Sequence, residues 1–122
     1  MMIEQVKKSD PSKEYYFHEG CFITEYSNGD DDQQCSIARA RVEAGKVTKW
    51  HSLEDITERY VIVTGKGLVE VGADTREQVV SGDVVIIPAG VRQRITNTGV
   101  EDLVFLAICT PRFQPENYTD LE

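Results

Sequence analysis

The sequence has no apolar run that approaches the roughly 20 residues a helix needs to cross a membrane. Its opening segment, MMIEQVKKSDPSKEYYF, lacks the apolar stretch of a signal peptide. Positive charge is also scarce, because 13 lysines and arginines stand against 21 aspartates and glutamates, giving a net charge of -8 at pH 7. We expect no nucleic-acid or membrane partner, since phosphate backbones and anionic lipid surfaces repel such a chain.

Cysteine is nearly as sparse. The three cysteines, Cys21, Cys35 and Cys109, lie far apart and form no C-x-x-C pair. An odd and scattered set supports neither a disulfide framework nor a structural zinc site. A reducing cytoplasm is therefore the expected compartment.

Long helices are not expected either, because no window sustains an apolar period of 3.6 residues. Short β-prone segments instead alternate with turns rich in glycine, which favours a single all-β sandwich or barrel. Residues 14–110 would form the barrel, residues 1–13 a polar N-terminal arm, and residues 111–122 a tail packed on the barrel by Phe113 and Tyr118. Periodicity alone leaves the order of strand pairing open.

Two central segments carry recognisable spacing. The segment from Gly45 to Gly65 reads G-x5-H-x-L-x4-E-x6-G, and the segment from Gly82 to Asn97 reads G-x5-P-x-G-x2-Q-x3-N. The glycines stand where a strand must reverse, and glycine reaches positive φ without a Cβ clash. Pro88 can end a strand because it has no N–H to donate.

These segments resemble the paired motifs of the cupin family, G-x5-H-x-H-x(3,4)-E-x6-G and G-x5-P-x-G-x2-H-x3-N. The resemblance implies an all-β, single-domain cupin jelly-roll barrel that is usually a homodimer. The chain departs from the pattern at two positions, where Leu53 and Gln93 replace histidines.

The resemblance also implies a metal site of three histidines and one glutamate, of which only His51 and Glu58 remain here. Gln93 offers a neutral amide oxygen in place of the histidine of the second motif. If the barrel closes as in the family, His51, Glu58 and Gln93 would converge and could bind a divalent transition metal, Fe, Mn, Ni or Zn. The alternative is a metal-free pocket in which Glu58 and Gln93 hydrogen-bond to His51 or to trapped water.

Strand alternation predicts which side chains line the cavity. Because burying unpaired arginines is costly, the arginines at 39, 41, 92 and 94 should point outward and their neighbours inward. His18 could supply a further ligand, although a surface position is the simpler interpretation. The expected lining residues are Ala38, Ala40, Leu53, Tyr60, Ile62, Ile95, Phe105, Ala107 and Cys109.

Fold does not settle activity in this family. The leading hypothesis is a small metal-binding cupin that acts as an enzyme on a small polar molecule, with the metal polarising a substrate oxygen. Glu58, as ligand or base, and Tyr60, as hydrogen-bond donor or weak acid, are the catalytic candidates. The alternative is a non-catalytic barrel that binds or senses a small-molecule ligand.

Overall fold

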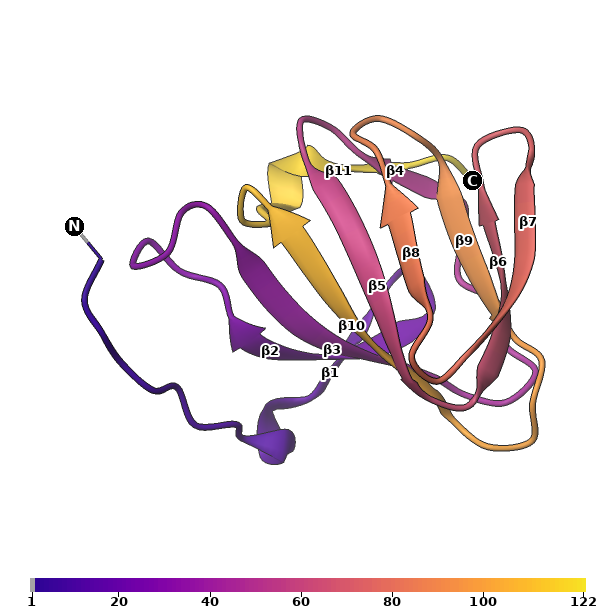
Figure 1. The fold of residues 1–122 in the computed structure, drawn as a ribbon, viewed down its shortest axis with the longest axis horizontal. Coiled ribbons are helices and arrows are strands. Elements are labelled where there is room, and N and C mark those ends of the chain that lie inside the picture. Colours follow the sequence, from indigo (N-terminus) through magenta and orange to yellow (C-terminus); the bar gives the residue numbers. More distant parts are fainter. Residues whose placement is uncertain (1) are drawn as a thin grey trace.

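Two antiparallel sheets face each other in the computed structural model, which describes residues 2–122 (Figure 1). The larger sheet has the order β1 (Tyr15–Phe17), β2 (Cys21–Ser27), β3 (Ser36–Val42), β10 (Leu103–Thr110), β5 (Thr57–Thr64) and β8 (Val84–Ile87). The smaller has the order β11 (Tyr118–Asp120), β4 (His51–Leu53), β9 (Gln93–Asn97), β6 (Lys66–Val71) and β7 (Thr75–Val80). The expected jelly-roll β-barrel is confirmed.

The inward faces follow the alternation of the strands. In β5, Glu58, Tyr60 and Ile62 are buried, and in β9 the buried residues are Gln93, Ile95 and Asn97. Apolar members of these faces, with others from β3, β6 and β10, form the main hydrophobic core between the sheets. The apolar side chains therefore fill one part of the barrel, and the polar side chains of the same faces lie in the remainder of its interior.

Charged residues of β3 lie on the outer face, as alternation predicts. Arg41 Nη2 lies 2.7 Å from Glu14 Oε1, and Arg39 Nη1 lies 3.4 Å from Glu14 Oε2. Arg41 also pairs with Asp102 at 3.2 Å. These arginines therefore face away from the cavity and cannot hold an anionic ligand there.

The tight turn between β5 and β6 shows why the motif needs glycine. Gly65 has φ of 87°, and a Cβ added to it would lie 2.7 Å from the carbonyl oxygen of Asp102. Both the left-handed conformation and the close backbone approach exclude a side chain here. Gly45 and Gly82 likewise have positive φ.

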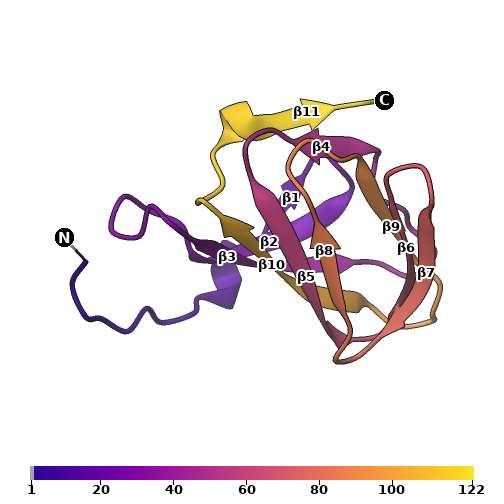
Figure 2. The ribbon, with the colours of Figure 1, turned by 45° about the horizontal axis from the view of Figure 1, so that its top comes forward.

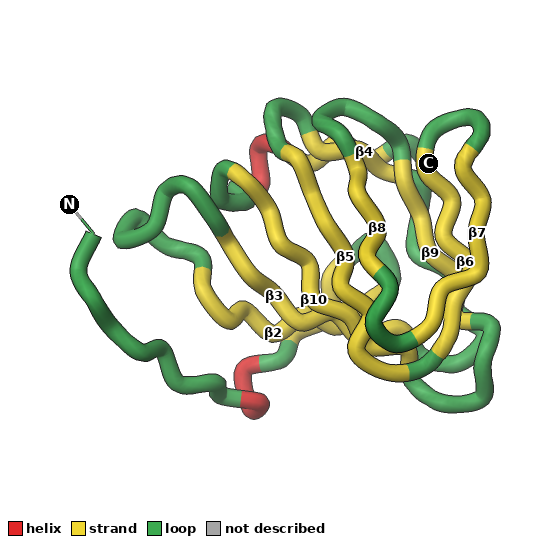
Figure 3. Tube along the Cα trace, in the orientation of Figure 1, coloured by secondary structure: helices red, strands yellow, loops and turns green. Residues whose placement is uncertain are grey.

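The two ends of the chain differ in their attachment. Residues 2–10 have no regular structure and lead to the short 3-10 helix η1 (Pro11–Lys13) on the outside of the molecule (Figure 3). The C-terminal tail passes through a second 3-10 helix, η2 (Pro115–Asn117), into β11, which lies beside β4 at one end of the barrel (Figure 2). Within residues 2–122, neither helix has the length and apolarity needed to cross a membrane.

Asn97, the last residue of the second motif, bonds to three backbone groups. Its side-chain amide donates to the carbonyl oxygens of Val42, at 2.9 Å, and Glu101, at 2.7 Å. Its side-chain oxygen accepts from the N–H of Gly99 at 2.9 Å. Asn97 is 1% exposed and Val42 is buried, so water cannot readily replace the bond between them.

Replacing Asn97 with alanine should lower the free energy of unfolding by about 1 to 3 kcal/mol, because the buried Val42 carbonyl loses its partner and the turn loses two further bonds. Urea denaturation of both proteins measures the difference. Thr98→Ala, at the exposed neighbouring position, is the matched control and should change stability by less than about 0.5 kcal/mol. Equal effects of the two changes would contradict this role of Asn97.

Candidate functional site

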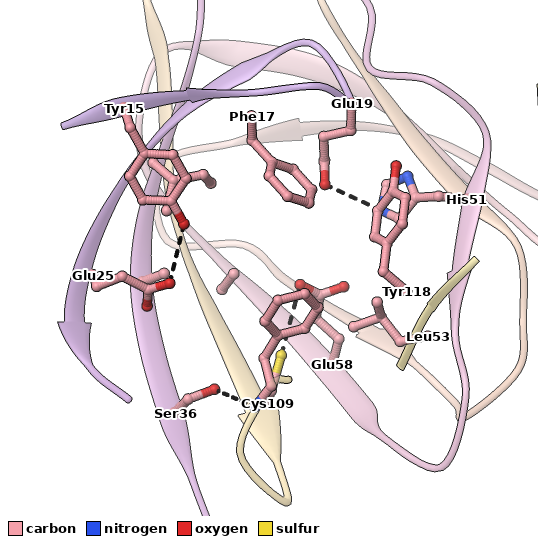
Figure 4. A pocket seen from close by; sticks show the side chains of 14 residues that line it. Tyr15, Phe17, Glu19, Glu25, Ser36, His51, Leu53, Glu58, Cys109 and Tyr118 are labelled. Atoms are coloured by element: carbon pink, nitrogen blue, oxygen red, sulfur yellow. Dashed lines mark hydrogen bonds and ion pairs between the residues drawn. The ribbon is translucent and has the colours of Figure 1, made fainter. Parts of the chain in front are cut away.

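A pocket opens between the sheets at the end of the barrel crossed by the C-terminal tail (Figure 4). Its empty volume is about 500 Å³, part of which is open to solvent. Aromatic rings and carboxylates dominate its walls. The lining residues are Tyr15, Phe17, Glu19, Ile23, Glu25, Ser36, Ala38, His51, Leu53, Glu58, Ala107, Cys109, Phe113 and Tyr118.

His51 presents one ring nitrogen to this pocket. Its Nδ1 lies 2.7 Å from the carbonyl oxygen of Lys49, and a carbonyl can only accept, so Nδ1 carries the proton. The lone pair of the neutral ring then lies on Nε2, which is 3.8 Å from Glu19 Oε1. Burial lowers the pKa of His51. The ring is therefore a neutral base at physiological pH.

Glu58 comes from the opposite sheet and is held by a hydrogen-bond chain. The Gln93 side-chain N–H donates to Glu58 Oε1 at 2.7 Å, and the Tyr60 hydroxyl donates to the Gln93 amide oxygen. The second carboxylate oxygen, Oε2, lies 3.9 Å from the Cys109 sulfur. Because Gln93 and Tyr60 are both buried, this chain fixes the position of Glu58 without solvent.

The carboxyls of Glu58 and Glu19 hold their protons unusually well. Burial, followed by the repulsion of the Glu19 carboxylate, raises the pKa of Glu58 to about 7, despite the opposing hydrogen bond from Gln93. Burial likewise raises the pKa of Glu19 to about 7. A neutral base and carboxyl groups that exchange protons near neutral pH therefore face one pocket, an arrangement suited to acid–base chemistry.

Comparison with known proteins identifies the family. The family model described as "Cupin domain" matches residues 38–109, more than half of the chain. The chain belongs to the cupin family. No curated protein matches this cupin in sequence.

Solved structures agree on the fold. A histidine-to-glutamine variant of Streptomyces Pac13 with uridine is 16% identical, with a TM-score of 0.81, and covers 98% of this chain and 92% of its own. KdgF from Halomonas is 15% identical, with a TM-score of 0.77, and the match covers 89% of this chain and 96% of KdgF. Oxalate decarboxylase from Lactobacillus farciminis is 22% identical, with a TM-score of 0.76, and the match covers 89% of this chain and 33% of the decarboxylase. At these identities the likeness establishes the fold alone.

The structure brings the three predicted metal ligands together but uses one of them differently. His51 pairs with Gln93 in the β4–β9 ladder, and Gln93 bonds to Glu58 across the barrel. The amide oxygen of Gln93, which metal binding requires, already accepts from Tyr60. Among residues 2–122, no group of three histidine, cysteine, aspartate or glutamate side chains is placed to hold a metal ion. In this arrangement the Gln93 oxygen is hydrogen-bonded to Tyr60, and binding of a metal by His51, Glu58 and Gln93 stays a prediction.

Only part of the predicted cavity lining faces the pocket. Ala38, Leu53, Ala107 and Cys109 line it. The other predicted lining residues lie in the hydrophobic core, where side chains from the two sheets interdigitate and fill the lumen; they are Ala40, Tyr60, Ile62, Ile95 and Phe105. Alternation gives the correct face of each strand but not the depth at which the barrel becomes solid.

Several polar residues of the pocket have no spacing signal in the sequence; they are Tyr15, Glu19, Glu25, Ser36 and Tyr118. Glu19 lies in the turn between β1 and β2, and Tyr118 lies on β11. The packing of Tyr118 on the barrel was expected, but its place in the pocket was not. His18, considered as a further ligand, is exposed and packs on Phe17 and the edge of Tyr118 instead.

The raised pKa of Glu58 predicts how stability depends on pH. Between its ordinary value of 4.5 and its folded value of about 7, the folded protein binds more protons than the unfolded chain. The free energy of unfolding should therefore fall as pH rises through this window. In Glu58→Gln, which cannot ionise, the fall between pH 5 and 8 should be smaller, by on the order of 1 to 3 kcal/mol.

Denaturant melts of both proteins across this pH range measure the difference. The comparison between proteins is needed because the lowered pKa of His51 acts in the opposite sense, raising stability as pH rises. Parallel pH profiles for the wild type and Glu58→Gln would show that Glu58 ionises as it does in the unfolded chain.

Proposed function

We propose that this cupin is an enzyme that transfers protons on a small uncharged molecule, with His51 as the base and Glu58 as the acid. The observation that carries the proposal is that a neutral imidazole Nε2 and a carboxyl with a pKa of about 7 face the same pocket from opposite sheets. A dehydration or an isomerisation is the reaction class that such a pair performs best.

In a dehydration, His51 Nε2 removes a proton from a substrate carbon. The electron pair of that C–H bond forms a double bond as the neighbouring C–O bond breaks, and Glu58 gives its proton to the departing hydroxyl, which leaves as water. Glu19, with Oε1 3.8 Å from Nε2, would stabilise the imidazolium ion. Proton transfer from His51 back to Glu58 restores the starting state.

The comparisons support a reaction of this class. Pac13 is described as "a unique nucleoside dehydratase", and its structure covers 97% of this chain with a TM-score of 0.79. Several Pac13 variants are described with uridine. A nucleoside is uncharged, carries several hydroxyl groups and has a flat ring, so it matches the chemistry of the pocket described above.

The charge of the pocket argues for an uncharged ligand. Glu19, Glu25 and Glu58 line it, and no lysine or arginine does so among the described residues. A phosphate group would meet these carboxylates without a compensating cation.

Uridine 5′-monophosphate should therefore bind at least about ten-fold more weakly than uridine at pH 7.5. Titration calorimetry with each compound measures the ratio. Raising the salt concentration should reduce the difference, because screening weakens the repulsion. Tighter binding of the phosphorylated compound would contradict an uncharged ligand.

Two other functions remain as alternatives that the same experiments distinguish. Metal polarisation on His51, Glu58 and Gln93, the hypothesis drawn from the sequence, would place the metal on the amide oxygen that accepts from Tyr60. A non-catalytic ligand-binding or sensing barrel would bind without turnover. The homodimer and the cytoplasmic location also stay predictions, drawn from the family resemblance and from cysteine usage.

Proton transfer can be tested without knowing the substrate, by following deuterium uptake from D2O into a panel of sugar aldehydes and ketones by NMR. The wild type should exchange a carbon-bound proton of at least one compound. His51→Gln and Glu58→Gln should lower that rate by about 10²- to 10⁴-fold, the usual contribution of a general acid or base. Thr98→Ala serves as the matched control and should leave it unchanged.

Exchange should also survive a chelator and gain nothing from added Fe, Mn, Ni or Zn, with a metal content near zero. Exchange that is lost with chelator and restored by one metal would replace the acid–base proposal with the metal mechanism. Exchange that is absent across the panel would favour the binding barrel.

A further inference from the structure

Tyr118, on the C-terminal strand, lines the pocket and carries a buried hydroxyl without a partner among the described residues. Among residues 2–122, the Tyr118 oxygen is the one buried side-chain nitrogen or oxygen without a hydrogen-bond partner. Buried hydroxyls nearly always have partners, so an exception calls for an explanation. Tyr118 also lines the pocket that contains His51 and Glu58 (Figure 4).

Packing fixes the ring that carries this hydroxyl. Tyr118 stacks on the His51 ring, with centroids 5.1 Å apart and planes 16° apart, and meets Phe17 edge-on at 5.2 Å. Burial and the nearby carboxylates, that of Glu19 first, raise the pKa of Tyr118. The hydroxyl therefore keeps its proton near neutral pH and is a donor held in one place.

The backbone ties Tyr118 to the strand of the proposed base. In the β11–β4 ladder, Tyr118 lies opposite Leu53, and Asp120 lies opposite His51. The ladder continues beyond β11, because the N–H of Leu121 donates to the Trp50 carbonyl oxygen at 3.0 Å. Tyr118 and His51 thus belong to two paired strands, and their side chains stack on each other.

We propose that Tyr118 is a specificity-determining residue whose hydroxyl donates a hydrogen bond to an oxygen of the ligand. The ligand is an uncharged, hydroxylated compound with a flat ring, such as a nucleoside, whose ring packs against the aromatic walls formed by Phe17 and Phe113. This inference rests on the proposed function only in placing the ligand in the same pocket. It adds the C-terminal tail to the recognition of that ligand.

The free protein gives the first test. Tyr118→Phe removes a hydroxyl that has no partner, so the melting temperature should stay within about 1 °C of the wild type or rise. Tyr60→Phe removes a hydroxyl bonded to Gln93 and should lower the melting temperature by about 4 °C or more. An equal loss in both variants would show that the Tyr118 hydroxyl is already satisfied and would overturn the inference.

Binding of uridine, measured by titration calorimetry, gives the second test. Tyr118→Phe should raise the dissociation constant about ten-fold, the effect of losing one hydrogen bond to a buried group. Tyr16→Phe is the matched control, because Tyr16 is exposed on β1 and does not line the pocket. That variant should bind as the wild type does.

Unchanged binding in Tyr118→Phe would overturn the inference, and so would a wild type that binds no uridine. Neither result bears on the acid–base proposal, which the deuterium exchange of the wild type decides separately. Conversely, ten-fold weaker binding in Tyr118→Phe with no deuterium exchange would support the inference and assign the pocket to binding alone.

Discussion

The hydrogen bond from Gln93 to Glu58 joins the two sheets inside the barrel, and the geometry of the site depends on it. It crosses from β9 to β5, measures 2.7 Å and is closed to solvent. The Tyr60 hydroxyl donates a hydrogen bond to the oxygen of the same Gln93 amide. A buried carboxyl fixed by neutral donors, with no cation beside it, keeps its proton to a higher pH than an exposed one. The bond therefore positions Glu58, while burial raises its pKa against the opposing effect of the bond and leaves the carboxyl able to act as an acid.

The motif spacing was sufficient to predict the fold. Gly65 stands where the backbone has a left-handed conformation, and Asn97 stands where one side chain bonds to three backbone groups. Few other residues could replace either one. Alternation also placed His51, Glu58 and Gln93 on inward faces. Because these features depend on residues close together in the sequence, motif spacing is enough to predict them.

What the sequence could not supply was the partner of each inward side chain. Gln93 looks like a substituted metal ligand when only the motif is considered, and only the structure shows its two amide atoms engaged by Tyr60 and Glu58. The depth of the pocket depends on how side chains from both sheets fill the lumen, which no single strand reveals. Glu19 and Tyr118 reach the site from the two ends of the chain, and neither lies in a motif.

The proposed chemistry depends on the tautomer of His51. Nitrogen-15 NMR of the ring at pH 7 tests it directly, because the two ring nitrogens differ in chemical shift according to which carries the proton. A neutral ring protonated at Nδ1, with an Nε2 signal that does not change when zinc or a chelator is added, is the predicted result. A ring protonated at Nε2, or an Nε2 signal that shifts to that of a metal-bound nitrogen, would contradict it.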